Sequence, residues 1–456
     1  NMISFENVEK VNWKYEALYP YVDFVHRYVY YRKFIVRNAE RIPKNKPVVV
    51  ICNHQNGLSD ALGILFSLKK DGRRPVFIAR ADIFKKEFVA KLLRFIRIMP
   101  AFRVRDTGKE NLGENQAIFS KSARIVAENG IVSLFPEAGH ESCRHLGTFK
   151  KGFARIAFQA AERLNFEQPV YIQPFSNHYS NYFKVQGKLV MTAGEPFEFS
   201  DLYDLYKENP PRAQKLLADR ARQKVKELML DIEDLSVYDE YDCIRKLYSF
   251  QVLKQEGKKI SDFANKLDAE IKIVASLDKL RAEDGEKYDK LMSQTNRYMR
   301  CLEKLHLRDW VLRRNISVCE FLARFFGVIF VLPFFLLSFL LNVIPYNVPS
   351  LVTRKLKDPM LMSSFYFGIG ALISYPLWFI ILSIIAIVIT KTWWVSLVIL
   401  PLLPLSLVTF LNGKVFIKKF IHLCRKFRFW YHGNPIYKEA LDLREEIVKT
   451  LKTIVK

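Results

Sequence analysis

A histidine and a carboxylate stand six positions apart in residues 53–60, which read Asn-His-Gln-Asn-Gly-Leu-Ser-Asp. A neutral imidazole such as that of His54 can accept a proton from a hydroxyl near neutral pH. A carboxylate on the other ring nitrogen, here Asp60, would fix the tautomer and stabilise the imidazolium that forms. Gly57 favours a short turn that returns Asp60 to His54. The pair alone is explained as well by a helix-capping Asp60 beside an incidental histidine, so its context must decide.

A second polar motif occupies residues 135–142, which read Phe-Pro-Glu-Ala-Gly-His-Glu-Ser. Glu137 supplies an acid, and Gly139 lets the backbone approach a ligand closely. His140 and His145 raise the question of a zinc site. They stand five positions apart, whereas the helical zinc motif needs two histidines four apart on one face. We therefore predict no metal site.

Basic residues form the third chemical element of the sequence. Arg80 ends an apolar run, Arg103 and Arg105 follow a predicted helix, and Lys151 follows the second motif. Arginine grips phosphate with a fork of donors, and lysine supplies a point charge. Each of these residues alone is more often an ordinary surface residue. Together, after strand ends, they predict an anion-binding pocket.

Short apolar runs rich in β-branched residues alternate with helical patterns over residues 40–200. The predicted strands are residues 47–52, 75–79, 131–135 and 170–174, and the predicted helices are residues 61–69, 84–97, 114–129 and 149–164. This alternation predicts an α/β domain. Active sites of such sheets lie beyond the carboxyl ends of the strands, where both polar motifs fall.

The regions that flank this domain differ from it in composition. Residues 1–39 interleave aromatic and basic residues, which predicts an amphipathic segment at a membrane interface, or else an ordinary aromatic-rich helix on a soluble core. Residues 201–318 are dense in charge with apolar residues at helical spacing, which predicts a solvated helical region.

Residues 319–411 have the composition of membrane segments. The apolar stretches 321–345, 365–389 and 393–411 each reach the about 20 residues that a membrane span needs. The 346–364 connector and the 412–456 tail are basic, and basic loops prefer the cytoplasm. Two spans satisfy this preference, with 321–345 re-entrant or interfacial and bent at Pro333; three spans are the alternative. Either way, we expect a protein of the cytoplasmic membrane whose catalytic domain faces the cytoplasm.

The formal net charge of +24 calls for an anionic partner. The sequence has no zinc-finger spacing, recognition-helix pattern or aromatic RNA-binding signature, so a membrane surface or a phosphorylated substrate is favoured over nucleic acid. Six scattered cysteines without a CxxC pair predict neither a disulfide framework nor a zinc site, which fits a reducing compartment.

Over residues 15–200, these motifs resemble in order those of the glycerolipid acyltransferase superfamily, which includes glycerol-3-phosphate and lysophosphatidate acyltransferases. The family's first motif is Asn-His, four residues, then Asp. Here five residues separate His54 from Asp60, a spacing that resembles a branch with fungal glycerol-3-phosphate acyltransferases and related bacterial proteins. The family's Phe-Pro-Glu-Gly motif stands here as residues 135–138, with Ala138 in place of the glycine.

The resemblance implies a mixed sheet flanked by helices and direct acyl transfer without a covalent intermediate. His54 and Asp60 would be catalytic. The residues expected to bind substrate are Arg80, Arg103, Arg105, Glu137, Gly139, His140 and Lys151. The donor would be acyl-CoA or an acyl carrier protein, with no cofactor, and the acceptor a phosphate-bearing lipid precursor in the membrane.

Other functions remain open from the sequence. The acceptor could be a non-glycerophosphate lipid such as an aminolipid. A lipid thioesterase or hydrolase would need a nucleophile, and no Gly-x-Ser-x-Gly elbow is present. A non-catalytic membrane adaptor would work through residues 201–318.

Overall fold

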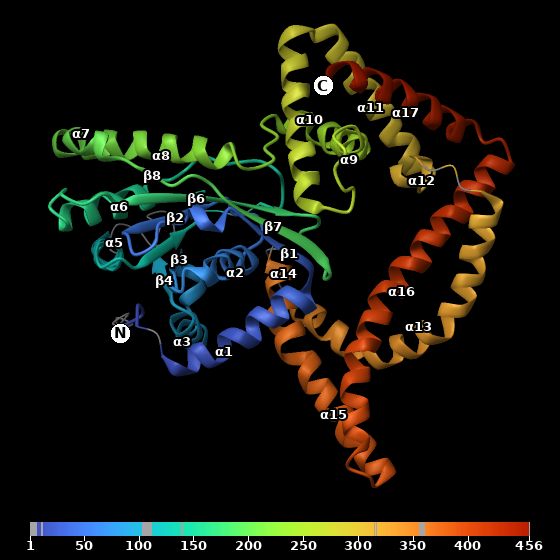
Figure 1. Cartoon of the computed structure of the whole chain (residues 1–456), viewed down its shortest axis with the longest axis horizontal. Coiled ribbons are helices and arrows are strands. Elements are labelled where there is room, and N and C mark those ends of the chain that lie inside the picture. The colour runs from blue at the N-terminus through green and yellow to red at the C-terminus, as the bar shows by residue number, and fades with distance from the viewer. Residues whose placement is uncertain are drawn as a thin grey trace. The chain divides into compact units, whose positions relative to one another are not determined.

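The computed structural model describes residues 7–10, 12–102, 112–137, 139, 141–313, 315, 317–354 and 361–455. The chain forms two compact units (Figure 1). Unit 1 comprises Asn1–Asp231 and Leu356–Phe367, and unit 2 comprises Ile232–Lys355 and Gly368–Lys456.

Within its described residues, unit 1 is built on one eight-stranded sheet with the order β1-β7-β6-β2-β5-β3-β4, and β8 pairs with β6. The strands are β1 (Tyr31–Arg37), β2 (Val48–Cys52), β3 (Val76–Arg80), β4 (Ile98–Ala101), β5 (Ile131–Leu134), β6 (Tyr171–Tyr179), β7 (Gly187–Ala193) and β8 (Phe197–Glu198). Neighbours from β6 to β4 run parallel, whereas β7 is antiparallel to β6. The predicted α/β fold with a mixed sheet flanked by helices is confirmed.

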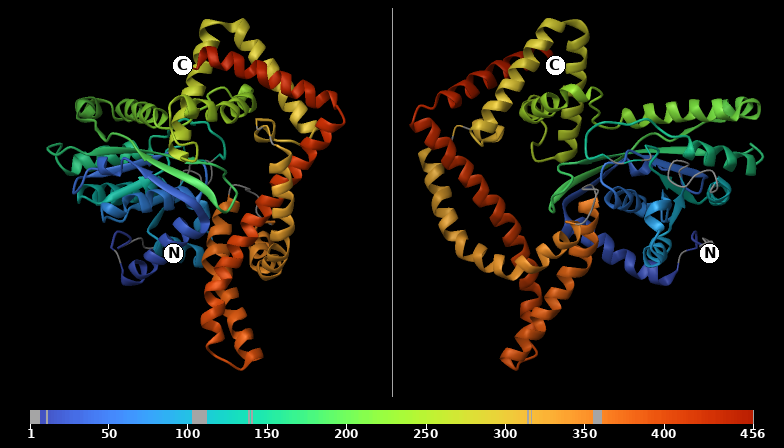
Figure 2. Two further views of the ribbon diagram at one scale, coloured as in Figure 1. Left: turned by 45° about the vertical axis from the view of Figure 1, so that its right-hand side comes forward. Right: turned by 180° about the vertical axis from the view of Figure 1, so that it is seen from behind.

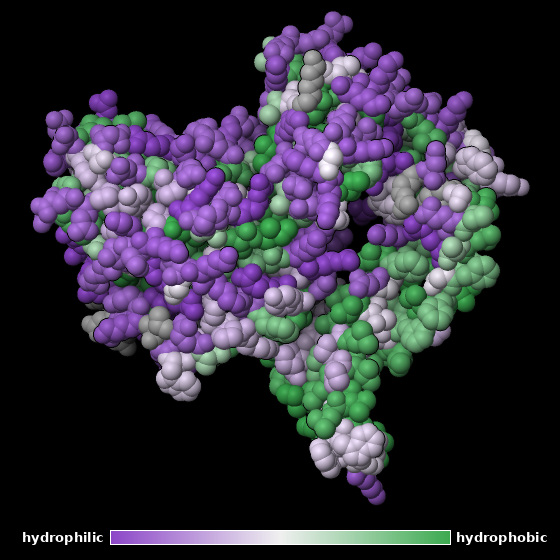
Figure 3. Space-filling model, viewed as in Figure 1, coloured by the Kyte–Doolittle hydropathy of each residue, from purple (hydrophilic) through white to green (hydrophobic). Residues whose placement is uncertain are grey.

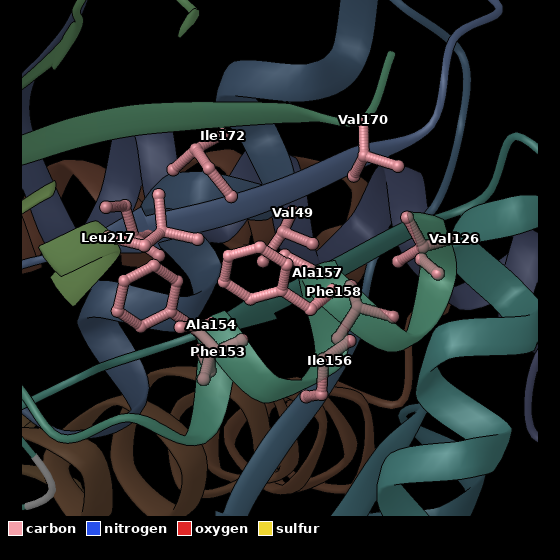
Figure 4. Packing of buried hydrophobic residues seen from close by; sticks show 14 of the residues in the cluster. Val49, Val126, Phe153, Ala154, Ile156, Ala157, Phe158, Val170, Ile172 and Leu217 are labelled. Atoms are coloured by element: carbon pink, nitrogen blue, oxygen red, sulfur yellow. The ribbon is translucent and has the colours of Figure 1, made fainter. Parts of the chain in front are cut away.

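Helices cover both faces of this sheet (Figures 1 and 2). They are α1 (Trp13–Phe24), α2 (Leu58–Ser67), α3 (Glu87–Phe95), α5 (Leu112–Ala127), α6 (Gly152–Arg163), α7 (Tyr203–Glu208) and α8 (Pro210–Lys226). All five residues of β2 are buried, as expected for a strand covered on both faces. One core cluster joins Val49 and Ile172 of the sheet to Phe158 of α6 and Leu217 of α8 (Figure 4). On α2, Gly63 lies against Met191 of β7.

The aromatic residues of the N-terminal segment are partly exposed and partly buried. Trp13, Phe24 and Tyr28 expose their rings, whereas Tyr15 and Tyr19 are buried. Residues 31–37, which the sequence included in the interfacial segment, instead form β1 and pair in parallel with β7. Tyr31–Arg37 is rich in aromatic and β-branched residues, which are common in strands.

Unit 1 continues past residue 200 because α8 closes its core. Ala213, Leu217 and Ala221 of this helix belong to the same buried cluster as β2 and α6. Asn209 caps α8 by accepting a hydrogen bond from the Arg212 amide.

The described residues of unit 2 form helices and connecting turns, with no strand among them. Its helices are α9 (Tyr238–Gln255), α10 (Phe263–Glu283), α11 (Gly285–Lys304), α12 (Asp309–Arg313), α13 (Val318–Thr353), α15 (Tyr375–Thr390), α16 (Val395–Tyr431) and α17 (Pro435–Ile454). Arg245 of α9 forms a buried ion pair with Glu270 of α10 at 2.6 Å. Burying two charges costs solvation, so a buried pair of this kind adds little net stability.

Among the residues that the structure describes, three helices are long and apolar enough to cross a membrane: Val318–Thr353, Met362–Thr390 and Val395–Tyr431. Apolar side chains gather on the surface of α13, α15 and α16, which indicates membrane association (Figure 3). Lys391 adopts a left-handed conformation in the turn between α15 and α16, which run side by side (Figure 2). Pro333 lies inside α13, which continues past it to Thr353, and the bend expected at Pro333 stays a prediction.

Candidate active site

His54 and Asp60 meet directly beyond the carboxyl end of β2. The distance from His54 Nδ1 to Asp60 Oδ2 is 2.8 Å. Asp60 lies in the first turn of α2, and Gly57 at the start of that helix has φ +48° and ψ −122°. Left-handed φ values favour glycine, so Gly57 allows the sharp turn that returns Asp60 to His54.

The Asp60 carboxylate is fully buried and organises its own loop. Its Oδ2 atom also accepts hydrogen bonds from the backbone amides of Gln55 at 2.8 Å and Asn56 at 2.7 Å. Hydrogen bonds to a charged acceptor are the strong ones in proteins. The carboxylate therefore fixes the backbone on either side of the turn as well as the imidazole.

Two residues of β6 complete the shell around this carboxylate. Asn177 Nδ2 donates to Asp60 Oδ1 at 2.9 Å, and the Tyr179 hydroxyl donates to the same oxygen at 2.5 Å. Asn177 also binds both the side chain and the carbonyl of Asn53. Burial and the neighbouring Asp60 raise the pKa of Tyr179 well above its usual value, so this hydroxyl stays a donor.

Asn177 and Tyr179 were not predicted as site residues from the sequence. The predicted strand ended at residue 174, whereas β6 continues to Tyr179. The available signal was the spacing of Phe175, Asn177 and Tyr179, which places the three side chains on one face of an extended strand.

The imidazole of His54 is held in a defined orientation. It stacks on the Phe135 ring with centroids 4.1 Å apart and an angle of 14° between the planes. An ionised carboxylate only accepts hydrogen bonds, so Nδ1 carries the proton and Nε2 carries the lone pair. This is the tautomer that a general base needs.

Glu137, which follows β5, binds the backbone of the loop that carries His54. Its Oε1 atom accepts a hydrogen bond from the His54 amide at 2.8 Å, and Oε2 accepts one from the Gly147 amide at 2.9 Å. Burial raises the pKa of the Glu137 carboxyl, although these two amides act in the opposite direction. In this structure Glu137 joins the two polar motifs through the backbone; its predicted substrate contact stays a prediction.

The described basic residues of the predicted site are Arg80 and Lys151. Arg80, at the end of β3, pairs with its neighbour Asp82 at 2.5 Å and leaves 43% of its side chain exposed. Because β5 lies between β2 and β3, Arg80 starts about 10 Å from the His54 strand. Lys151 Nζ donates to the Pro211 carbonyl at 2.9 Å and therefore does not bond to the His54–Asp60 pair in this structure.

Some predicted site residues cannot be placed. Arg103, Arg105 and His140 lie outside the described residues. Gly139 is described, and a Cβ atom there would meet nothing within 4 Å. Among the residues that the structure describes, no group of three or more His, Cys, Asp or Glu side chains could hold a metal ion.

Residues 33–177 match the family model described as Acyltransferase. A curated relative, "Probable 1-acyl-sn-glycerol-3-phosphate acyltransferase" of Mycoplasma pneumoniae, is 26% identical over 166 residues. That match covers 35% of this chain and 59% of the relative, so this chain spans less than two thirds of the relative's length.

A crystal structure of the 1-acyl-sn-glycerophosphate (LPA) acyltransferase PlsC from Thermotoga maritima is similar over 48% of this chain and 86% of that chain. Its sequence identity is 16% and its TM-score 0.30, too low a score to bear on the fold. The matched family segment runs from β1 to the Asn177 that contacts Asp60. Residues 33–177 therefore form a domain of the acyltransferase family, as the resemblance to the glycerolipid acyltransferase superfamily predicted.

Proposed function

We propose that this chain is a membrane-bound O-acyltransferase of phospholipid biosynthesis. It transfers a fatty acyl chain from a thioester donor to a hydroxyl of glycerol 3-phosphate or a lysophospholipid. The observation that carries the proposal is the buried Asp60 carboxylate 2.8 Å from His54 Nδ1, inside the matched family segment. The printed name of the Mycoplasma relative supports a glycerophosphate acceptor.

In the proposed reaction, His54 Nε2 removes the proton of the acceptor hydroxyl as its oxygen attacks the thioester carbonyl. The new C–O bond forms and the C–S bond breaks. The thiolate that leaves then accepts the proton from the imidazolium. Asp60 stabilises that imidazolium while it exists. No metal or organic cofactor takes part, and the donor is acyl-CoA or an acyl carrier protein.

The proposed setting is the cytoplasmic membrane, with the catalytic domain facing the cytoplasm. Three apolar helices support membrane residence. The lysines and arginines of α16 after Asn412 support a cytoplasmic position for that end of the helix. Anionic membrane lipids are the expected partners of a chain with a net charge of +24, and nucleic acid is not.

An acceptor panel tests this function. The full-length protein in vesicles receives a radiolabelled acyl-CoA or acyl carrier protein with glycerol 3-phosphate, lysophosphatidate or an aminolipid precursor, and the products are separated by thin-layer chromatography. We expect label in a new ester only when a phosphate-bearing acceptor is present. Release of free fatty acid at the same rate without any acceptor would identify a hydrolase and overturn the proposal.

A further inference from the structure

A segment from the C-terminal part of the sequence is built into unit 1. Residues 361–367 belong to this unit, and the helix that they begin continues as the apolar helix Met362–Thr390. Ser364 Oγ accepts a hydrogen bond from the backbone amide of Leu58 at 3.0 Å, although the two residues are 306 positions apart. Leu58 is the first residue of α2, two positions before Asp60.

This hydrogen bond caps α2 from outside its own sequence. The first amides of any helix lack partners within it, and a side chain at the N-cap position usually supplies one. Here the N-cap residue is Gly57, which has no side chain to do so. Ser364 therefore supplies, from a distant part of the sequence, an acceptor for the first amide of α2.

Glycine at position 57 also makes the contact sterically possible. A Cβ atom built on Gly57 would lie 2.9 Å from Ser364 Oγ and 3.8 Å from Leu361 Cδ2. The first distance is shorter than a normal van der Waals contact, so any larger residue would push Ser364 away. The motif loop and the 361–367 segment thus fit each other closely.

Two aromatic contacts anchor the segment. The hydroxyl of Tyr30 donates to the Ser363 carbonyl at 3.1 Å and lies 2.8 Å from Ser363 Oγ. Phe367 is fully buried, edge-on to the rings of Tyr30 and His26 with centroids 5.2 Å and 5.8 Å apart. The His26 ring lies 5.0 Å from Phe66 near the end of α2. The segment is therefore fixed against the elements that support α2.

We propose that Ser364 is a positioning residue for the His54–Asp60 loop, and that residues 361–367, from which the apolar helix continues, are part of the catalytic framework. The inference rests on the proposed acyl transfer. The amides of Gln55 and Asn56 hold Asp60 directly, and Ser364 holds the amide of Leu58 that follows them. Displacing the start of this helix releases the turn that aligns His54.

The kinetic test compares Ser364→Ala with Ser383→Ala in vesicles. Ser383 lies in the same apolar helix, but its hydroxyl donates to its own helix at the Phe379 carbonyl, at 2.8 Å. For Ser364→Ala we expect kcat to fall about tenfold with KM for both substrates unchanged, since the substitution disturbs alignment through one hydrogen bond. Ser383→Ala keeps wild-type constants. An unchanged kcat in Ser364→Ala overturns the inference and leaves the proposed function standing.

A paired substitution tests the contact itself. Gly57→Ala places a methyl group against Ser364, so Ser364→Gly should recover part of the kcat that Gly57→Ala loses. The same positive φ strains alanine in both backgrounds, so the recovery reports the contact alone. Strictly multiplicative losses would show that positions 57 and 364 do not meet in the working enzyme.

Hydrogen exchange supplies a readout that needs no activity. Peptides that cover residues 53–62 should exchange faster in Ser364→Ala than in wild type or Ser383→Ala, because the Leu58 amide loses its acceptor. Equal exchange in all three proteins overturns the inference even if no acceptor is found. Absence of acyl transfer by the wild type combined with faster exchange would refute the proposed function but retain the contact.

Discussion

The carboxyl ends of β2 and β3 hold their polar side chains in opposite ways. Beyond β2, the Asp60 carboxylate is 0% exposed and accepts hydrogen bonds from His54, two backbone amides and two side chains of β6. Beyond β3, Arg80 is 43% exposed and forms an ion pair with its near neighbour Asp82. The side chains beyond β2 are therefore held in place before substrate binds, whereas Arg80 beyond β3 can exchange Asp82 for another anionic partner.

This contrast matches two separate chemical tasks. Proton transfer needs a base held in one tautomer and one orientation, and preorganised groups avoid the cost of rearrangement during the reaction. Capture of a phosphate group needs a cation that exchanges a weak exposed ion pair for a better partner at little cost. Substitutions at the end of β2 should therefore lower kcat, and substitutions at the end of β3 should raise KM.

The largest effect among the supporting groups is expected for Asp60→Asn. The amide keeps the size of the carboxylate but places an NH₂ group among donors, so the tautomer of His54 is no longer enforced. We expect kcat to fall by about 10³ or more, together with a lower melting temperature, since buried donors lose their acceptor. Asp201→Asn, which breaks an exposed pair with Arg220, is the control and should change neither quantity. A kcat for Asp60→Asn within a factor of three of wild type would remove the carboxylate from the mechanism.

A smaller effect is expected for Glu137→Gln, which weakens the hydrogen bonds from the Glu137 side chain to the His54 and Gly147 amides. We expect kcat to fall about tenfold, because one of the two backbone amides loses a charged acceptor. The substitution also changes the pH dependence of stability. The folded-state pKa of Glu137 is raised, so its contribution to the unfolding free energy is complete below its ordinary pKa and is lost as pH rises through the raised value.

Melting temperatures of wild type and Glu137→Gln across this range check that sign. The wild-type advantage should shrink as pH rises from about 4.5, where the unfolded carboxyl titrates. A difference that stays constant with pH, or grows as pH rises, would contradict the assigned direction.

The smallest effect on turnover is expected at the end of β3. Arg80→Ala should raise KM for a phosphate-bearing acceptor about tenfold while kcat changes less than twofold, because an exposed arginine contributes to capture and not to proton transfer. Lys91→Ala removes an exposed cation of α3 that pairs with Glu87 and should leave KM unchanged. A loss of kcat at constant KM in Arg80→Ala would mean that the two strand ends do not divide the tasks as described.

The sequence predicted the parts of this arrangement that depend on local pattern. Short apolar runs rich in β-branched residues predicted β2, β3 and β5, because strands covered on both faces read as nearly continuous apolar segments. The turn at Gly57 and the return of Asp60 to His54 also followed from short spacing. The three apolar helices were visible from length and composition alone.

The rest depended on partners that are distant in the sequence. β1 was missed because Tyr31–Arg37 reads as an amphipathic segment until β7 is beside it. Asn177 is a polar residue in a strand, and its role appears only when β6 lies next to β2. Ser364 is the last residue of the 346–364 connector, and nothing local in the sequence links it to Leu58.

The acyl-transfer rate of His54→Ala tests the central claim most directly. It should be measured in vesicles beside His432→Ala, which alters an exposed histidine of unit 2. We predict that His54→Ala loses transfer to a phosphate-bearing acceptor by about 10² or more with membrane association intact, whereas His432→Ala matches wild type. Transfer by His54→Ala at a rate close to that of His432→Ala would contradict a general base at this position.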